Sequence, residues 1–237
     1  ADTNAGKYQL VAELLENVPP ARLFDEMLKL LTSGHAVKCI TQLREEGLHH
    51  GLLPLLDVIL EQPMGERFVM LSLANTDARV QRGKPISPGF LFATLLWHEV
   101  LAHWDKLKGQ GEAQIPALYA AMDQILDVQA EKLAITRRIA GDIKEIWSLQ
   151  PRFDSRAGKR PYALIEQPRF RAAYDFLVLR AEAGEIDKEL AEWWTDFQEA
   201  DGEERARMLL PEKPGDKKKR RRRRKPRAEG AEPTPAA

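Results

Sequence analysis

The sequence predicts an all-α fold, with a multi-helix body followed by a basic tail. Apolar residues recur at helical spacing along most of the chain, and no stretch shows the strict alternation that is typical of β-strands. Proline lies near the expected helix starts, and glycine follows several expected ends. With 237 residues, of which 43% are hydrophobic, the chain is long enough to bury one large or two small cores.

The expected helices of the first half are separated by short breaks. Pro19-Pro20 suits a first helical turn, and Ser33-Gly34 ends the helix that follows. The apolar spacing predicts helices at 1–18 (weakly), 20–31, 35–46, 48–60 and 66–80. A basic turn follows at 79–84.

The second half begins with the most apolar stretch of the chain. Ser87 supplies a capping hydroxyl and Pro88 a first-turn proline. Residues 90–104 are apolar on nearly every face, so we expect them to form the buried central helix. Further helices are expected at 116–133, 135–149, 168–183 and 190–198, with a basic loop at 153–161 and Gly184 as a helix end.

Charge is strongly segregated, although the chain is neutral overall. Residues 137–180 contain ten basic and five acidic residues, whereas 181–211 contain three and ten. Residues 212–237 contain 11 basic and four acidic residues, among them nine consecutive Lys or Arg. Dense like charge without apolar surface predicts a disordered polycation, which would attract RNA, DNA or an anionic membrane without reading sequence.

Aromatic side chains lie among the basic residues of 137–180. Arginine binds phosphates and aromatic rings stack on bases, so the stretch predicts an RNA-binding region; alternatively, the rings form a helical core and the arginines are solvated. Arg169 and Arg180 lie nearly in line on the expected helix, about 16 Å apart, which suits the phosphates of one strand. The candidate RNA-contacting residues are Arg137, Arg138, Arg152, Arg156, Lys159, Arg160, Arg169, Arg171, Arg180, Lys217, Lys218, Lys219, Arg220, Arg221, Arg222, Arg223, Arg224 and Lys225.

No catalytic or metal-binding constellation is predicted. His98 and His103 flank a Glu, but they are five residues apart, whereas a zinc-protease helix needs two histidines four apart on one face. Cys39 has no CxxC partner and suits an apolar helix face. The chain has no phosphate-binding glycine motif, and its closely spaced carboxylates at 187–189 and 201–203 lie in surface-like acidic sequence.

Cysteine content and hydropathy indicate the cellular compartment in which the protein is expected to work. A single cysteine cannot form an internal disulfide, which suits a reducing cytoplasm. No apolar run reaches the length of a membrane span, and the first residues do not resemble a signal peptide. We therefore expect a cytoplasmic protein without a membrane partner.

Two stretches of the sequence carry motifs of a known family. The first is the expected helix Asn-Val-Pro-Pro-Ala-Arg-Leu-Phe-Asp-Glu-Met-Leu-Lys-Leu-Leu at 17–31. It resembles the neck helix of bacterial poly(A) polymerases, which belong to the family that includes the CCA-adding nucleotidyltransferases, and its Arg22, Glu26 and Lys29 match the family pattern on the nucleotide side. The segments Ile-Trp-Ser-Leu-Gln-Pro-Arg-Phe, Arg-Ala-Gly-Lys-Arg and Pro-Arg-Phe-Arg-Ala-Ala-Tyr-Asp-Phe-Leu-Val-Leu-Arg resemble the family's body, and the arginine-rich end resembles its tail.

The resemblance implies an RNA-binding neck, body and tail, and also what the chain lacks. The family's catalytic head has a Gly-Ser turn and a magnesium-binding aspartate pair, and nothing in this sequence corresponds to them. The resemblance therefore implies addition of AMP from ATP to RNA 3′ ends only together with a head domain, which would bind ATP and magnesium. We expect this chain alone to be inactive.

The resemblance also suggests a division of the chain. The expected segments are neck helices at 1–34, a helical body at 35–135, a basic RNA-binding helical region at 136–210 and a disordered polybasic tail at 211–237. Two alternatives remain open: a stand-alone helical RNA-binding adaptor, and a helical scaffold whose tail binds acidic proteins or membranes.

Overall fold

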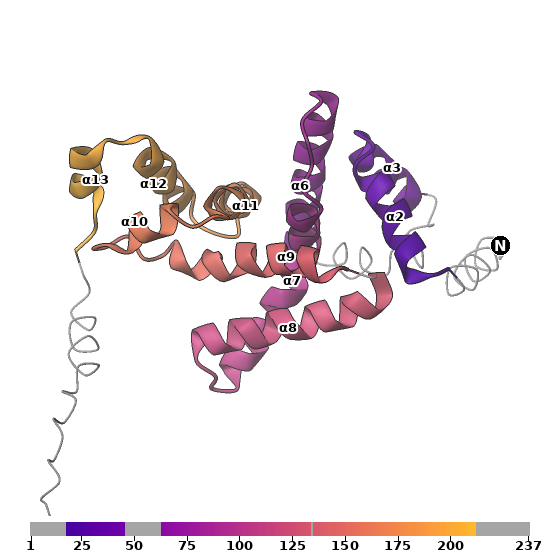
Figure 1. The fold of residues 1–237 in the computed structure, drawn as a ribbon, viewed down its shortest axis with the longest axis horizontal. Helices are drawn as coiled ribbons and strands as arrows, with labels where there is room; N and C mark the ends of the chain where they lie inside the picture. The colour runs from indigo at the N-terminus through magenta and orange to yellow at the C-terminus, as the bar shows by residue number, and fades with distance from the viewer. Residues whose placement is uncertain (1–17, 46–62, 134, 212–237) are drawn as a thin grey trace, which may run out of the picture.

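The computed structural model describes residues 18–45, 63–133 and 135–211, and every regular element in these ranges is a helix, as predicted. The expected helix at 48–60, nearly all of that at 1–18 and the basic tail lie outside the described residues. The elements in chain order are α2 (Pro20–Leu31), α3 (Ala36–Glu45), α6 (Pro63–Gln81), α7 (Pro88–Gly109), α8 (Gln114–Leu133), α9 (Arg137–Leu149), η1 (Gln150–Arg152), α10 (Arg160–Ile165), α11 (Phe170–Ala183), α12 (Lys188–Glu199) and α13 (Gly202–Met208) (Figure 1).

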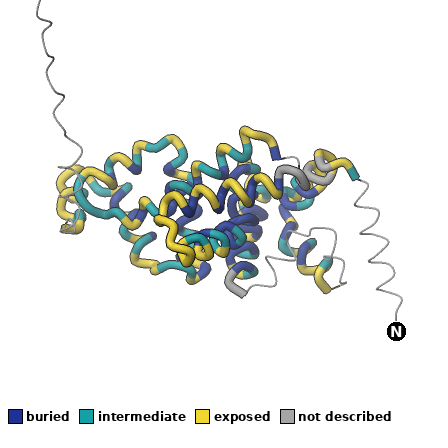
Figure 2. The backbone as a smooth tube through the Cα atoms, turned by 90° about the horizontal axis from the view of Figure 1, so that it is seen from below, coloured by how far each residue is buried: buried dark blue, intermediate teal, exposed yellow. Residues whose placement is uncertain are grey.

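Helix α7 is the central buried helix, as the sequence predicted. The Ser87 hydroxyl accepts a hydrogen bond from the Phe90 amide at 3.3 Å, and Pro88 follows in the first turn. Nearly every residue from Leu91 to His98 is fully buried, because α6, α8, α9 and α11 surround this part of the helix. Buried residues accordingly concentrate in the middle of the molecule (Figure 2).

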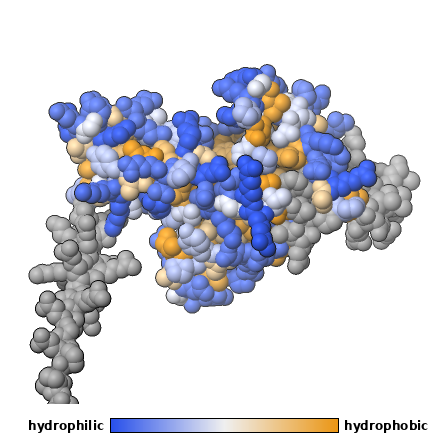
Figure 3. Space-filling view, in the orientation of Figure 1, coloured by the Kyte–Doolittle hydropathy of each residue, from blue (hydrophilic) through white to orange (hydrophobic). Residues whose placement is uncertain are grey.

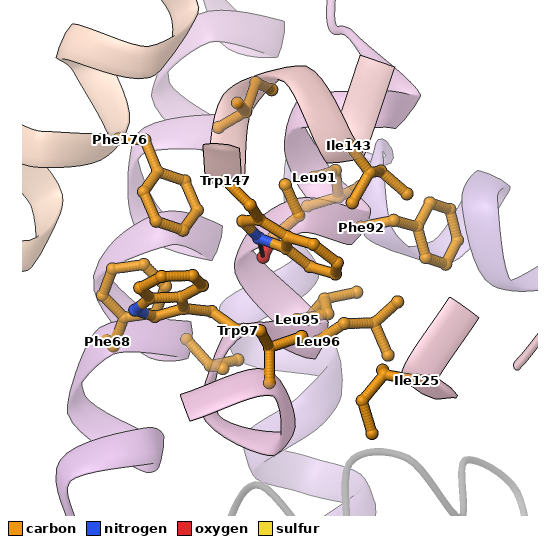
Figure 4. Close-up of a cluster of buried hydrophobic side chains, with 14 of the residues drawn as sticks. Phe68, Leu91, Phe92, Leu95, Leu96, Trp97, Ile125, Ile143, Trp147 and Phe176 are labelled. Atoms are coloured by element: carbon orange, nitrogen blue, oxygen red, sulfur yellow. Dashed lines mark hydrogen bonds between the residues drawn. The ribbon is translucent and has the colours of Figure 1, made fainter. Parts of the chain in front are cut away.

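The larger of two hydrophobic cores is built around a pair of tryptophans. Trp97 of α7 and Trp147 of α9 lie beside Phe176 of α11, and the Trp97 and Phe176 ring centroids are 5.3 Å apart (Figure 4). The Trp147 indole nitrogen donates to the Ala93 carbonyl at 3.0 Å, so this buried polar group is paired. The two helices that contain Trp147 and Phe176 are thereby fixed against α7.

A smaller core lies at the other end of α9 and α11. Trp194 of α12 packs against Phe153, and its indole nitrogen donates to the Phe153 carbonyl at 2.9 Å. Helices α9 and α11 contribute to both cores, so they join the two halves of the molecule. The larger core contains residues from both sides of position 135, which is one of the expected segment boundaries. The division of the chain into four segments stays a prediction.

Two short helices were not predicted from the sequence. Helix α10 begins at the end of the loop expected at 153–161 and continues beyond it to Ile165. Pro161 occupies the first turn of this helix. Helix α13 begins with a capping box, because the Asp201 carboxylate accepts from the Glu204 amide while the Glu204 side chain accepts from the Asp201 amide. After α13, the Leu210 amide donates to the Arg156 carbonyl at 2.9 Å, which ties the basic loop to the end of the described chain.

None of the helices in the described ranges is long and apolar enough to span a membrane.

Candidate nucleic-acid interface

A groove of about 700 Å³ opens between α6, the turn after it, the first turn of α7 and α11. Arginines from two separate parts of the sequence meet there: Arg79 and Arg82 from α6 and its turn, and Arg169 and Arg171 from the start of α11. The wall between them includes Phe90 and apolar residues of α11. On the face in Figure 3, the surface is hydrophilic over most of the helices, with apolar patches between them.

On the α6 side of the groove, no described carboxylate pairs with Arg79 or Arg82. The Arg79 guanidinium donates to the Pro85 carbonyl at 3.1 Å, which holds it over the turn. Among the described residues, no side chain or backbone group pairs with the exposed guanidinium of Arg82. Both side chains are therefore available to an anion.

The α11 side holds its arginines in fixed positions. Arg169 pairs with Asp142 and, at 3.2 Å, with Glu145, both on α9. Arg171 pairs with Asp175 at 3.1 Å, and its guanidinium lies 5.4 Å from the centre of the Tyr174 ring. These contacts balance part of the charge but leave Arg171 mostly exposed, so its guanidinium plane is presented to the groove in a defined orientation.

The loop from η1 to α10 forms a second basic surface. Arg152, Lys159 and Arg160 are exposed there. Arg156 differs, because its guanidinium packs 5.9 Å from the Trp193 ring centre and lies 3.8 Å from the Glu189 carboxylate.

Arg137 and Arg138 are exposed at the start of α9, and neither lines the groove. The nine tail residues from Lys217 to Lys225 lie outside the described residues.

Arg180 does not lie beside Arg169 on an exposed helix face, as was expected for two arginines that contact the phosphates of one strand. Its side chain is only 12% exposed, donates to Glu185 at 2.8 Å and to Gln150 at 3.1 Å, and lies 5.0 Å from the centre of the Trp97 ring. Burial among partners explains the difference, since helical spacing places a residue on a face but does not show what covers that face. We therefore remove Arg180 from the proposed RNA-contacting set.

The aromatic residues of 137–180 form the cores. Their rings are buried except for Tyr162, which is half-buried and packs edge-on against Phe197; the buried ones are Trp147, Phe153, Phe170, Tyr174 and Phe176. Of the two interpretations of this stretch, the structure supports a helical core for the rings. The phosphate-binding interpretation then concerns the arginines alone.

The neck-like residues occupy one exposed face of α2. Arg22, Glu26 and Lys29 are all exposed, while Met27 and Leu31 are buried beneath them. On this face, the Glu26 carboxylate accepts a hydrogen bond from Lys29 at 2.9 Å.

The histidines of α7 have different surroundings. His98 is buried edge-on to Phe68, with a ring-centroid distance of 5.3 Å, while His103 is half-buried near the end of the helix. The part of the chain that the structure describes contains no group of three or more residues placed to bind a metal.

Arg79 and Arg82 line the groove, although they were not among the candidate residues predicted from the sequence. The basic turn at 79–84 was visible in the sequence, but nothing there showed that it lies opposite a helix some 90 residues further on. Only the packing of α6 against α11 brings the two sets of arginines together.

Comparison with known proteins defines the class of this helical chain. Residues 110–228 match the family described as "Polymerase A arginine-rich C-terminus", and residues 9–60 match the region described as "Probable RNA and SrmB- binding site of polymerase A". The chain therefore belongs to the polymerase A family, and it corresponds to the carboxy-terminal part of that family's members.

The relatives are poly(A) polymerases. The chain is 40% identical to poly(A) polymerase I of Haemophilus influenzae over 84% of its length, and 38% identical to those of Salmonella typhi and Escherichia coli O6:H1 over 93%. It spans between 45% and 50% of the length of these relatives.

Proposed function

We propose that this chain is the RNA-binding carboxy-terminal part of an enzyme that adds AMP units from ATP to RNA 3′ ends. The match of residues 110–228 to the arginine-rich terminus of polymerase A carries this proposal. Its support from the structure is the basic groove, where arginines with fixed partners from α6 and α11 face one space. Arginines held in position suit phosphate binding in a defined register.

The chemistry of AMP transfer belongs, in this proposal, to a head domain of the same polypeptide. The relatives are about twice as long as this chain, which leaves room for such a domain. ATP and magnesium would bind there, where a carboxylate pair would hold a metal ion that stabilises the charge on the α-phosphate during adenylyl transfer. The exposed α2 face with Arg22, Glu26 and Lys29 would lie toward the nucleotide in the intact enzyme. The single cysteine suits work in the cytoplasm.

RNA is the proposed partner of three regions. These are the groove, the loop with Arg152, Lys159 and Arg160, and the tail from Lys217 to Lys225. Residues 9–60 add a fourth candidate contact, because the polymerase A region that they match is described as a probable RNA- and SrmB-binding site.

Two assays test the proposal. The purified chain should bind a fluorescent single-stranded oligoribonucleotide but incorporate no labelled AMP with ATP and magnesium, whereas the polypeptide extended upstream should lengthen the same RNA. Failure of the purified chain to bind RNA would contradict the assigned RNA-binding role. An extended polypeptide without transfer activity would instead favour the stand-alone adaptor.

A further inference from the structure

The groove between α6 and α11 has features that a general phosphate-binding surface does not need. It is hollowed to about 700 Å³, within the range of roughly 300–1,000 Å³ that small-ligand sites occupy. Its arginines lie on two sides, and partly exposed apolar side chains, Phe90 and Val178, line the space with them. A flat cationic surface would bind a phosphate chain equally well. A ligand with an apolar part would fill the hollow and contact its apolar lining as well as the arginines.

We propose that this groove binds a nucleotide unit of single-stranded RNA, with its base in the hollow and its flanking phosphates at the arginines. This inference rests on the proposed function and deepens it, because it assigns RNA binding to a particular site. The phosphate on one side meets Arg79 and Arg82, and the phosphate on the other side meets Arg169 and Arg171.

The base has two kinds of partner in the groove. Phe90 and Val178 offer apolar contact, and the guanidinium plane of Arg171, held by Asp175 and the Tyr174 ring, offers a stacking surface. Asn75 also lines the groove and is exposed, and among the described residues nothing pairs with its amide. An unpaired amide can both donate to and accept from a base edge. A base-paired duplex would not present its bases in this way, so the site favours a single strand.

The carboxylates do not exclude an anionic ligand. Asp175, which lines the groove, is paired with Arg171, while Asp142 and Glu145 share Arg169. These three carboxylates exceed their two arginines by one charge, and the two positive charges of Arg79 and Arg82 make the whole set positive. Arg79 and Arg82 have no such partner among the described residues and supply the net attraction.

The test compares charge-matched variants of the full chain at raised salt, where attraction by the tail is weakest. Arg79→Ala/Arg82→Ala should weaken binding of a single-stranded oligoribonucleotide roughly tenfold, the effect of losing one or two hydrogen bonds to charged groups. It should also lower the slope of log affinity against log salt by about 1.4. The control, Lys106→Ala/Lys188→Ala, removes two exposed cations that do not line the groove and should bind like the unaltered chain.

Two further measurements separate the base from the phosphates. RNA with abasic positions should bind several-fold more weakly to the unaltered chain, and this difference should shrink in Arg171→Ala, which removes the stacking plane. Oligoribonucleotides with photoreactive bases should crosslink to peptides that include 75–90 or 168–179. Circular dichroism melts of each variant show whether it folds, and Arg82→Lys, which keeps the charge, should retain most of the affinity.

The outcomes distinguish this inference from the proposed function. RNA binding by the unaltered chain that is unaffected by Arg79→Ala/Arg82→Ala would overturn the groove site and leave RNA binding itself standing. Equal competition by polyglutamate and by RNA for the crosslinked site would overturn the nucleotide as its ligand. Absence of RNA binding by the unaltered chain would overturn the proposed function.

Discussion

Asp77 illustrates how a single residue of α6 fixes another helix. Its side chain is buried, and its carboxylate oxygens accept hydrogen bonds from the Ala36 amide at 2.8 Å and the Val37 amide at 3.1 Å. Amides in the first turn of a helix have no acceptor within the helix, so Asp77 caps α3 from 40 residues away.

Asp77→Ala should therefore lower the free energy of unfolding by about 1–3 kcal/mol, because the α3 amides lose their buried partner. Asp105→Ala is the matched control, since Asp105 is exposed and its one ion pair among the described residues is with Lys108, at 2.7 Å; its loss should change stability by less than about 1 kcal/mol. Urea unfolding of both variants makes the comparison, and similar effects would contradict the capping role.

His98 should make stability depend on pH. Burial lowers the pKa of His98 from its usual 6.5, although the carboxylate of Glu185 opposes this shift and Arg180 adds to it. Because the folded chain binds this proton less readily than the unfolded chain, the free energy of unfolding should decrease as the pH falls below about 6.5. The pH dependence of the melting temperature between about 5 and 7 should be flatter in His98→Leu. Identical profiles would show that His98 titrates alike in both states.

At the scale of elements, α7 and α9 approach closely where Gly89 faces Asp142. A Cβ atom on Gly89 would lie 2.7 Å from the Asp142 Cβ, too close for any real contact. Asp142 in turn pairs with Arg169, so this approach also positions an arginine of the groove.

Gly89→Ala should push α9 away from α7 and destabilise the fold by about 1–3 kcal/mol. The control is Gly109→Ala at the other end of the same helix, where nothing lies within 4 Å of the added atom; alanine there should be neutral or slightly stabilising. Thermal melts that rank the two variants the other way would contradict the close approach.

Local sequence patterns predicted much of the helical structure and less of the site. Local sequence predicted the helix caps at Ser87 and Gly184 and the apolar helix around Trp97, because these features depend on residues that are neighbours in the chain. The burial of Arg180 and the presence of Arg79 and Arg171 in one groove depend on contacts between helices distant in sequence, which periodicity does not report. Helix α10 is six residues long, too short for an apolar repeat to be distinguished from a loop.

For the whole molecule, we propose two modes of RNA binding, one by the basic tail and one by the folded body. Both cores lie within residues 27–209, so a chain that ends at position 211 contains every described residue of the two cores. The tail at 212–237 lies outside the described residues, and its sequence holds 11 basic residues. The body contributes arginines with fixed positions at the groove, and exposed cations on the η1–α10 loop.

The salt dependence of RNA affinity, measured for the full chain and for residues 1–211, tests this separation most directly. If about five tail residues contact phosphates, deletion of the tail should lower the slope of log affinity against log salt by roughly 3 to 4 units. The shortened chain should still bind single-stranded RNA, with a residual slope of about 2 to 3 from some four cations of the body. A folded 1–211 chain that does not bind RNA even at low salt would contradict the account, because all binding would then reside in the tail.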